Sequence, residues 1–234
     1  MSKIHPRIEQ MSLLTEGIST LPLTAIHYKH KIIVTEVLSE AWNEIIGLNK
    51  INMLKMDEPE ITSLLEIQLN KIIGLNPIWG MLVSSVVRGR EMVSFDASHL
   101  EKKPDLSIIF HGRSANFPLI IECKIIEVSK TVNLYCRDGL SRFIAGEYAW
   151  YAKEAMMLAY VKDKSTLSSS LIPQLIKHQK KETDTYSTCK LPASIIKTKL
   201  NLKESSHQRS FGYIGGCTSD KPDEICIWHL WLNL

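Results

Sequence analysis

Hydrophobic and polar positions along the chain fall into blocks, and the period of each block predicts its secondary structure. Apolar residues recur at helical spacing over residues 24–46, where Gly47 suits the helix end, and again over residues 59–74. The pattern then changes to two β-branched apolar runs, 108–110 and 119–121, which flank a polar turn. The sequence therefore predicts two amphipathic helices followed by a strand hairpin.

The remaining blocks extend this pattern into an α/β protein. Residues 83–87 and 91–95 are predicted as two strands joined by a glycine-containing turn, ahead of the hairpin. The segment 140–161 is rich in alanine and has helical spacing, so we expect a long helix that lies against the sheet. Another helix is expected over 191–200, and the alternating run 225–232 is expected to add a closing strand.

Composition and charge fit an ordinary globular domain. The chain has 234 residues, of which 44% are hydrophobic and 23% charged, so it is long enough to bury a sizeable core. Its formal net charge of +3 is compatible with nucleic-acid binding without arguing for it. We expect a soluble cytoplasmic protein, because the sequence contains neither a signal-peptide core nor an apolar run of about eighteen residues.

Cysteines, glycine-rich loops and histidines narrow the chemistry further. The five cysteines are irregularly spaced and contain no CxxC pair, which argues against a zinc site and fits a reducing compartment. No P-loop and no glycine-rich dinucleotide fingerprint occurs, so no nucleotide cofactor is expected. His27 and His30 are three residues apart and could form half a metal site, although a solvated or structural role is the default.

Charged residues gather at one end of the predicted hairpin. Asp105 opens the first strand, and Glu122 and Lys124 share a face of the second strand, opposite to Cys123. With the turn midway between the strands, cross-strand partners have numbers that sum to about 227, which sets Asp105 opposite Glu122. Two facing carboxylates repel unless a proton or a cation separates them, and Mg²⁺ prefers oxygen ligands. The alternative is a simple ion pair at a sheet edge.

The motif Pro-Asp at 104–105 followed by Glu-Cys-Lys at 122–124 resembles the signature of the PD-(D/E)xK nuclease superfamily, which includes many restriction endonucleases. The resemblance implies an α/β fold with a restriction-endonuclease-like three-layer core, in which helices flank a central mixed β-sheet. Within a single domain over 1–234, the expected parts are an N-terminal helical arm (1–56), a catalytic core (57–161) and a C-terminal elaboration with a closing strand (162–234).

The resemblance also implies roles for individual residues. Asp105 and Glu122 would be catalytic and would hold Mg²⁺, or Mn²⁺ as a substitute, with the main-chain carbonyl of Cys123 as a third oxygen. Lys124 would orient the attacking water or act as a base, and a nearby divalent cation would lower its pKa. Glu60, on the helix before the first core strand, is expected to reach the metal, unless it only complements the helix dipole.

Basic residues are the candidates for nucleic-acid contact. In this superfamily the helix after the Glu-x-Lys strand commonly carries a residue that assists the site. The predicted helix has three polar candidates for this role, Arg142, Tyr148 and Lys153, and the sequence does not choose among them. The candidates for nucleic-acid binding are Arg142, Lys153, Lys180, Lys181 and Arg209, with solvated or structural roles as the default.

The resemblance predicts a Mg²⁺-dependent endonuclease that hydrolyses phosphodiester bonds of DNA, of a restriction or phage-defence kind. The alternative is a catalytically inactive nucleic-acid-binding or scaffold protein on the same fold, and RNA stays open as a substrate. Because two identical chains match the two-fold symmetry of a duplex, a homodimer is expected.

Overall fold

The computed structural model describes residues 15–16, 20–96, 101–194, 201–213 and 222–234. The helices are α2 (Tyr28–Met53), α3 (Glu58–Leu75), α4 (Pro77–Leu82), α5 (Val132–Tyr135), α6 (Ser141–Ile144) and α7 (Ile172–Gln179), with π-helical turns η1 (Cys136–Leu140) and η2 (Leu167–Leu171). The strands are β1 (Val83–Arg88), β2 (Leu106–Phe110), β3 (Leu119–Ile126), β4 (Glu154–Val161), β5 (Thr188–Ala193), β6 (Leu202–His207) and β7 (Ile225–Asn233).

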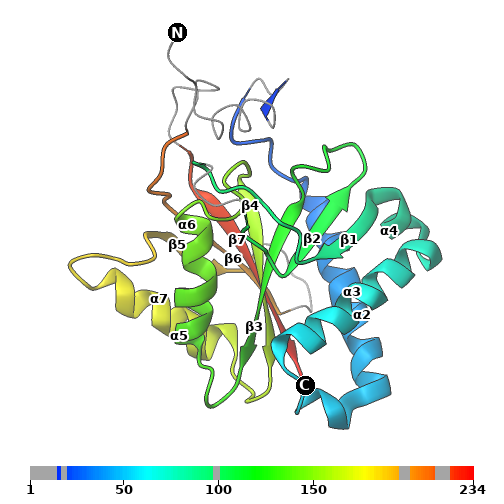
Figure 1. The fold of residues 1–234 in the computed structure, drawn as a ribbon. Coiled ribbons are helices and arrows are strands. Elements are labelled where there is room, and N and C mark those ends of the chain that lie inside the picture. Colours follow the sequence, from blue (N-terminus) through cyan, green and yellow to red (C-terminus); the bar gives the residue numbers. More distant parts are fainter. Residues whose placement is uncertain (1–14, 17–19, 97–100, 195–200, 214–221) are drawn as a thin grey trace.

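These strands form one seven-stranded mixed sheet in the order β1-β2-β3-β4-β7-β6-β5. The central strands β3, β4 and β7 run parallel, and the outer strands pair antiparallel with their neighbours. Helices α2, α3 and α4 cover one face, and α5, α6 and α7 cover the other (Figure 1). The predicted α/β architecture, with a mixed sheet between helical layers, is therefore confirmed.

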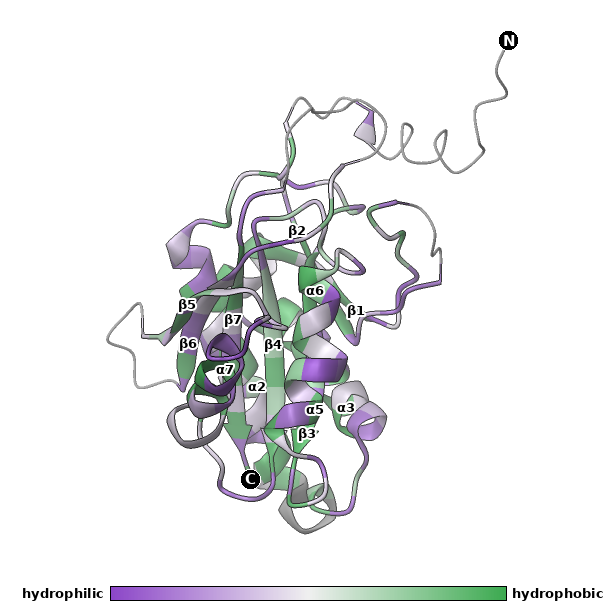
Figure 2. Cartoon of the chain, turned by 90° about the vertical axis from the view of Figure 1, so that its left-hand side faces the viewer, coloured by the Kyte–Doolittle hydropathy of each residue, from purple (hydrophilic) through white to green (hydrophobic). Residues whose placement is uncertain are grey.

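Each face of the sheet carries its own hydrophobic core. One core packs α2, α3 and α4 onto the sheet, and the other packs the segments from α5 to α7 onto the opposite face. Figure 2 shows the central strands as the most hydrophobic part of the chain. All eight residues of β4 are buried, as expected of a parallel strand that is covered on both faces.

The two helices predicted nearest the N-terminus both form. α3 follows its N-cap Asp57 and extends one residue beyond each predicted end. α2 begins at Tyr28 and continues through Gly47 to Met53, so the predicted stop at the glycine is wrong. A glycine inside a helix costs only about 1 kcal/mol, and burial of the Met53 side chain beyond it stabilises the longer helix by more.

The helix predicted over residues 140–161 is wrong. α6 ends at Ile144, Gly146 follows with a φ of +74°, and residues 154–161 form the buried strand β4. An apolar run that is buried on both sides lacks the polar face that would distinguish a helix from a central strand. The alanines and methionines of this segment therefore pack within the sheet instead of against it.

The predicted hairpin of residues 83–87 and 91–95 does not form. β1 pairs antiparallel with β2 instead, with Val86 opposite Ile108. On the free side of β1, the Asn70 amide of α3 accepts from the Val86 N–H at 3.0 Å and donates to the Val86 carbonyl at 2.8 Å. The side chain of Asn70 therefore occupies the edge of β1 at which a further strand would pair.

The C-terminal part of the chain adds strands to the same sheet that contains the strands of the expected catalytic core, 57–161. The strand predicted over 225–232 forms as β7, between β4 and β6. The helix predicted over 191–200 is wrong where it is described, because residues 188–193 form the edge strand β5, and residues 195–200 lie outside the described residues. Across the described residues, no helix has both the length and the apolarity that crossing a membrane requires.

Candidate active site

The candidate site lies where strand β2 separates from strand β3. The predicted register is confirmed, with Leu106 opposite Ile121, and pairing between the two strands stops there. Beyond this point, the Cys123 N–H donates to Oδ2 of Asp105 at 2.7 Å, and the Ile125 N–H donates to Oε2 of Glu58 at 3.0 Å. Two carboxylates thus take the hydrogen bonds that a neighbouring strand would otherwise accept.

The side chain of Lys124 lies among three carboxylates at this fork. Its Nζ is 3.0 Å from Oε1 of Glu58, 3.0 Å from Oε1 of Glu122 and 3.6 Å from Oδ2 of Asp105. It also donates to the carbonyl of Cys123 at 2.6 Å. Burial alone would lower the pKa of Lys124, but Glu122, Asp105 and Glu58 raise it above its ordinary value. The lowered pKa that the sequence predicts requires a divalent cation, and the carboxylates alone have the opposite effect.

Glu122 is the most buried of these carboxylates, with 1% of its side chain exposed. Its Oε1 accepts from Lys124 and from Nη1 of Arg142, which lies at 3.1 Å. Its Oε2 is buried and has no hydrogen-bond partner within the residues that the structure describes. Burial and the nearby Asp105 raise the pKa of Glu122 to about 8, although the two cations oppose this shift.

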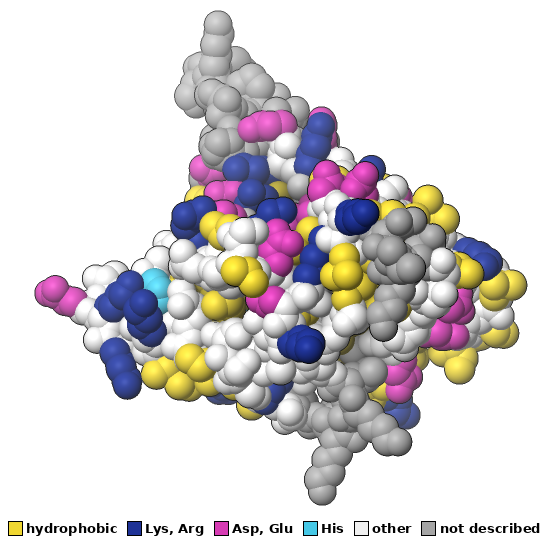
Figure 3. Space-filling view, turned by 90° about the horizontal axis from the view of Figure 1, so that it is seen from below, with side chains coloured by type: hydrophobic (Ala, Val, Ile, Leu, Met, Phe, Trp, Pro, Cys, Tyr) yellow, Lys and Arg dark blue, Asp and Glu magenta, His cyan; other side chains and the backbone are white. Residues whose placement is uncertain are grey.

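Arg142 is held against Glu122 by a short polar chain. Its Nη1 donates to the Tyr148 hydroxyl at 2.9 Å, and that hydroxyl donates to the carbonyl of Lys103 at 3.0 Å. Of the three polar residues that the sequence left as alternatives, Arg142 therefore reaches the site directly, and Tyr148 reaches it through Arg142. Seen from below, Figure 3 shows acidic and basic side chains next to each other in the middle of this face.

The π-helical turn η1 lets the chain approach Glu122 closely. A Cβ added at Gly139 would lie 2.5 Å from Cε of Met157 and 3.5 Å from Cγ of Glu122. A larger residue here would require the end of the Met157 side chain to move, and α6, which carries Arg142, follows directly. Sequence reasoning missed Gly139, because π-turns have no simple periodic signal.

The prediction that Glu60 reaches the site is wrong, because Glu58 from the same helix reaches it instead. The side chain of Glu60 accepts from the Asp57 N–H at 2.8 Å, and Oδ1 of Asp57 accepts from the Glu60 N–H at 2.9 Å. This capping box turns Glu60 toward the helix end, and Glu58 reaches β3 instead. The Asp-x-x-Glu spacing of Asp57 and Glu60 is the sequence signal for this capping box.

Most of the candidates for nucleic-acid contact lie apart from the cluster around Lys124. Lys153, which directly precedes β4, forms an ion pair with Asp223 at 3.4 Å. Lys180 and Lys181 are exposed at the end of α7.

Arg209 does not fit a nucleic-acid contact. It is only 4% exposed, and its guanidinium donates to the carbonyls of Asp223 at 2.8 Å and Ala152 at 3.0 Å. The prediction of a nucleic-acid contact is therefore wrong for Arg209, which instead ties three chain segments together.

The arrangement is not a ready-made metal site. Within the described residues, no three His, Cys, Asp or Glu side chains converge closely enough to hold an ion as they stand. The ammonium group of Lys124 lies where the carboxylates of Asp105, Glu122 and Glu58 meet. Binding of a divalent cation by these carboxylates would therefore require Lys124 to move.

Comparisons of the chain with protein-family models, with curated proteins and with solved structures each gave no match. The geometry of the site and its sequence motif are therefore the features that bear on function.

Proposed function

We propose that the protein is a Mg²⁺-dependent endonuclease that hydrolyses phosphodiester bonds of DNA. The observation that carries the proposal is the buried oxygen Oε2 of Glu122, which has no partner in the described structure and lies in a cluster with Asp105 and Lys124. A buried carboxylate oxygen without a donor is costly, unless a ligand supplies the missing interaction.

The order of elements supports a restriction-endonuclease-like core. A helix (α3) precedes three antiparallel strands (β1, β2, β3), a helical segment follows, and β4 returns parallel to β3. Asp105 directly precedes β2, and Glu122 and Lys124 lie on β3. This is the arrangement that the resemblance of the motif implies for the catalytic residues.

The oxygen atoms at the fork fit a hard divalent cation. Asp105, Glu122 and the carbonyl of Cys123 would hold Mg²⁺ or Mn²⁺, and Glu58 takes the place expected of Glu60. When bound, the ion supplies charge neutralisation and an activated water.

The protein's own residues have separable tasks in this proposal. Lys124 donates hydrogen bonds, so once it leaves the carboxylates it can orient a water or bind a phosphate oxygen. Arg142 holds Oε1 of Glu122 in place, and Tyr148 holds Arg142. The carboxylates of Asp105 and Glu58 remain anchored through the amides of β3.

Plasmid cleavage tests the proposal and uses a matched pair on α3. We expect Mg²⁺-dependent nicking that falls about 100-fold or more in Asp105→Ala, Glu122→Gln and Lys124→Ala. Glu58→Gln is expected to lose activity, whereas Glu60→Gln is expected to lose only capping stability. Cleavage that persists unchanged in Asp105→Ala and Lys124→Ala would show that this site is not catalytic. The same assay with RNA decides between the two nucleic acids.

The second candidate is a catalytically inactive nucleic-acid-binding or scaffold protein. The observation that favours it is the ammonium of Lys124, which already neutralises the three carboxylates. In that case Mn²⁺ would not bind and DNA would not be cut, even if DNA bound. Restriction or defence biology and a homodimer follow from the resemblance, and the cytoplasmic location follows from the pattern of cysteines and apolar residues. Sedimentation with and without DNA tests the dimer.

A further inference from the structure

We propose a second ligand site, a phosphate-binding pocket between the start of α2 and the turn that joins β2 to β3. The cavity has a volume of about 280 Å³, and its basic side chains are Arg113, His27, His30 and His111. Since Asp105 precedes β2 and this turn follows it, the length of that strand, roughly 16 Å, separates the pocket from the candidate active site.

The side chain of Arg113 is the main anion-binding group of the proposed pocket. Its guanidinium is half-buried and donates to the carbonyl of Thr24 at 2.6 Å, and it forms no ion pair within the described part of the chain. Burial lowers its pKa, and Glu154 and Tyr151 only partly counteract that effect. Arginine presents five N–H donors in a fork that matches an oxyanion, so most of its donors remain available for a ligand.

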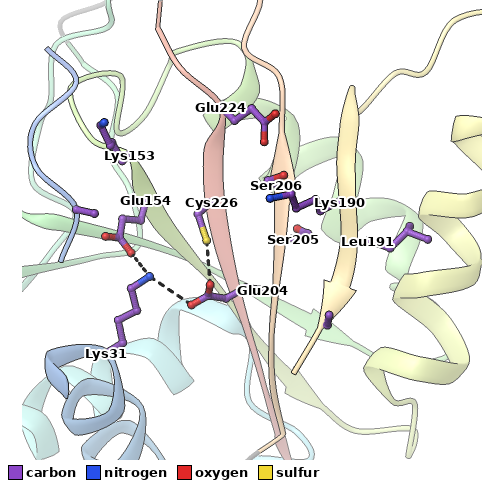
Figure 4. A pocket seen from close by; sticks show the side chains of 12 residues that line it. Lys31, Lys153, Glu154, Lys190, Leu191, Glu204, Ser205, Ser206, Glu224 and Cys226 are labelled. Atoms are coloured by element: carbon purple, nitrogen blue, oxygen red, sulfur yellow. Dashed lines mark hydrogen bonds and ion pairs between the residues drawn. The ribbon is translucent and has the colours of Figure 1, made fainter. Parts of the chain in front are cut away.

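The carboxylate that acts on Arg113 from nearby, Glu154, is fully engaged elsewhere. It accepts from the Ile26 N–H, from Nε1 of Trp228 at 3.0 Å and from Nζ of Lys31 at 2.6 Å. Figure 4 shows the contact between Lys31 and Glu154 in a neighbouring cavity of about 440 Å³, which three lysines and three glutamates line. That cavity is balanced in charge, whereas the pocket of Arg113 is not.

The lining of the Arg113 pocket selects for an anion. Among the described residues that line it, none is acidic, and Leu82, Phe110 and Ile26 supply an apolar wall. His27 and His30 lie with ring centroids 5.9 Å apart at the start of α2, and His111 comes from the other side, next to Gly112. Imidazole N–H groups and a guanidinium donate hydrogen bonds to phosphate oxygens.

A transition metal is the other ligand that histidines suggest. Arg113, which forms no ion pair within the described residues, lines the same pocket, and its positive charge repels a cation. No His, Cys, Asp or Glu group of three in the described residues is arranged to hold a metal. A phosphate group, carried by a small molecule or by a nucleic-acid backbone, is therefore the ligand class that the pocket fits.

Isothermal titration of the full chain tests the site with inorganic phosphate, a deoxynucleoside 5′-monophosphate and a short DNA duplex as separate probes. We expect Arg113→Gln to weaken binding about 10- to 100-fold, and His111→Gln to weaken it about 10-fold. Arg90→Gln is the matched control, because Arg90 donates to the carbonyl of Ala115 in the same turn at 2.5 Å but does not line the pocket. Circular dichroism checks that each variant is folded.

The three probes separate the two sources of phosphate. Binding of inorganic phosphate or the monophosphate that Arg113→Gln and His111→Gln both weaken supports a small-molecule site. Binding of the duplex alone, weakened in the same two variants, supports a contact with the nucleic-acid backbone. The proposal is overturned if no probe binds, if Arg90→Gln weakens binding as much as Arg113→Gln does, or if Zn²⁺ binds and phosphate does not. Because Arg113 lies outside the candidate active site, these outcomes are independent of plasmid cleavage.

Discussion

A single buried carboxylate, Glu122, links the electrostatics of the candidate active site to its packing. One of its oxygens is shared by Lys124 and Arg142, and the other has no partner in the described structure. A Cβ added at Gly139 would be in ordinary van der Waals contact with its Cγ, at 3.5 Å, but would overlap the neighbouring side chain of Met157. A change at Gly139 therefore tests whether the packing beside Glu122 matters for function.

We predict that Gly139→Ala displaces the end of the Met157 side chain, because the new Cβ would lie 2.5 Å from its Cε. Overpacking of this kind costs about 1–3 kcal/mol of unfolding free energy, and plasmid cleavage should fall with it. The control is Gly47→Ala inside α2, where a Cβ meets nothing within 4 Å and should stabilise the protein by about 0.5–1 kcal/mol. Equal unfolding midpoints in urea for both variants would contradict this prediction.

At the scale of elements, the start of α2 is fixed to the sheet by Glu154, at the beginning of β4. Its carboxylate binds Lys31 of α2, the Ile26 N–H just before the helix and the indole of Trp228 on β7. The ammonium of Lys31 also lies 4.9 Å from the ring centroid of Trp228. One buried side chain therefore joins a helix to two neighbouring parallel strands.

Removal of the Glu154 charge should be strongly destabilising. We predict that Glu154→Gln costs about 3–5 kcal/mol, because it leaves Lys31 largely buried without its main partner. Glu204→Gln is the control: Glu204 lies 3.4 Å from the same ammonium, farther than Glu154 at 2.6 Å, and is less buried than Glu154, so its loss should cost less than the loss of Glu154. Urea denaturation measures both values, and similar losses in the two variants would refute the anchoring role of Glu154.

Elements that depend on local chemistry could be predicted from the sequence, whereas elements that depend on tertiary burial could not. The cap predicts the bounds of α3 to within one residue at each end. The register of β2 with β3 follows from the turn and from alternation, and it is confirmed. The sequence predicts a helix where β4 forms, since burial on both faces removes the polar positions that would reveal the period of the strand. The motif gathered Asp105, Glu122 and Lys124, but Glu58 was missed because the capping box decides which glutamate is free to reach β3.

At the scale of the whole molecule, a buried chain of hydrogen bonds crosses from α5 to the far strands of the sheet. The carbonyl of Tyr186 can only accept, so His207 donates to it from Nδ1 at 2.8 Å. Ser205 then donates to Nε2 of His207 and accepts from Nε2 of His229, both at 2.7 Å, and Tyr135 donates to Nδ1 of His229 at 2.8 Å. Every link requires neutral histidines, and protonation of either ring would bury a charge. On His207 the added proton would leave the Ser205 hydroxyl without an acceptor, and on His229 it would leave the Tyr135 hydroxyl without its acceptor Nδ1.

This chain and Glu122 together predict a stability maximum near pH 6.5. Burial lowers the pKa of His207 to about 4 and that of His229 well below its ordinary value, so below about pH 6.5 the unfolded chain binds protons that the folded chain does not. Each histidine then removes roughly 1 kcal/mol of stability per pH unit. Glu122 acts in the opposite direction: with its pKa raised to about 8, its contribution is lost as the pH rises toward 8.

Urea denaturation at pH 5, 6.5 and 8 measures this dependence, and single variants assign it. His229→Gln is expected to be less stable at pH 6.5 but to lose less stability between pH 6.5 and 5, since one of the two buried rings is gone. Glu122→Gln should remove the decline between pH 6.5 and 8. If stability instead rises from pH 6.5 to 5 in the unmodified protein, the two histidines do not remain neutral in the fold, and the directed hydrogen-bond chain from Tyr135 to Tyr186 is wrong.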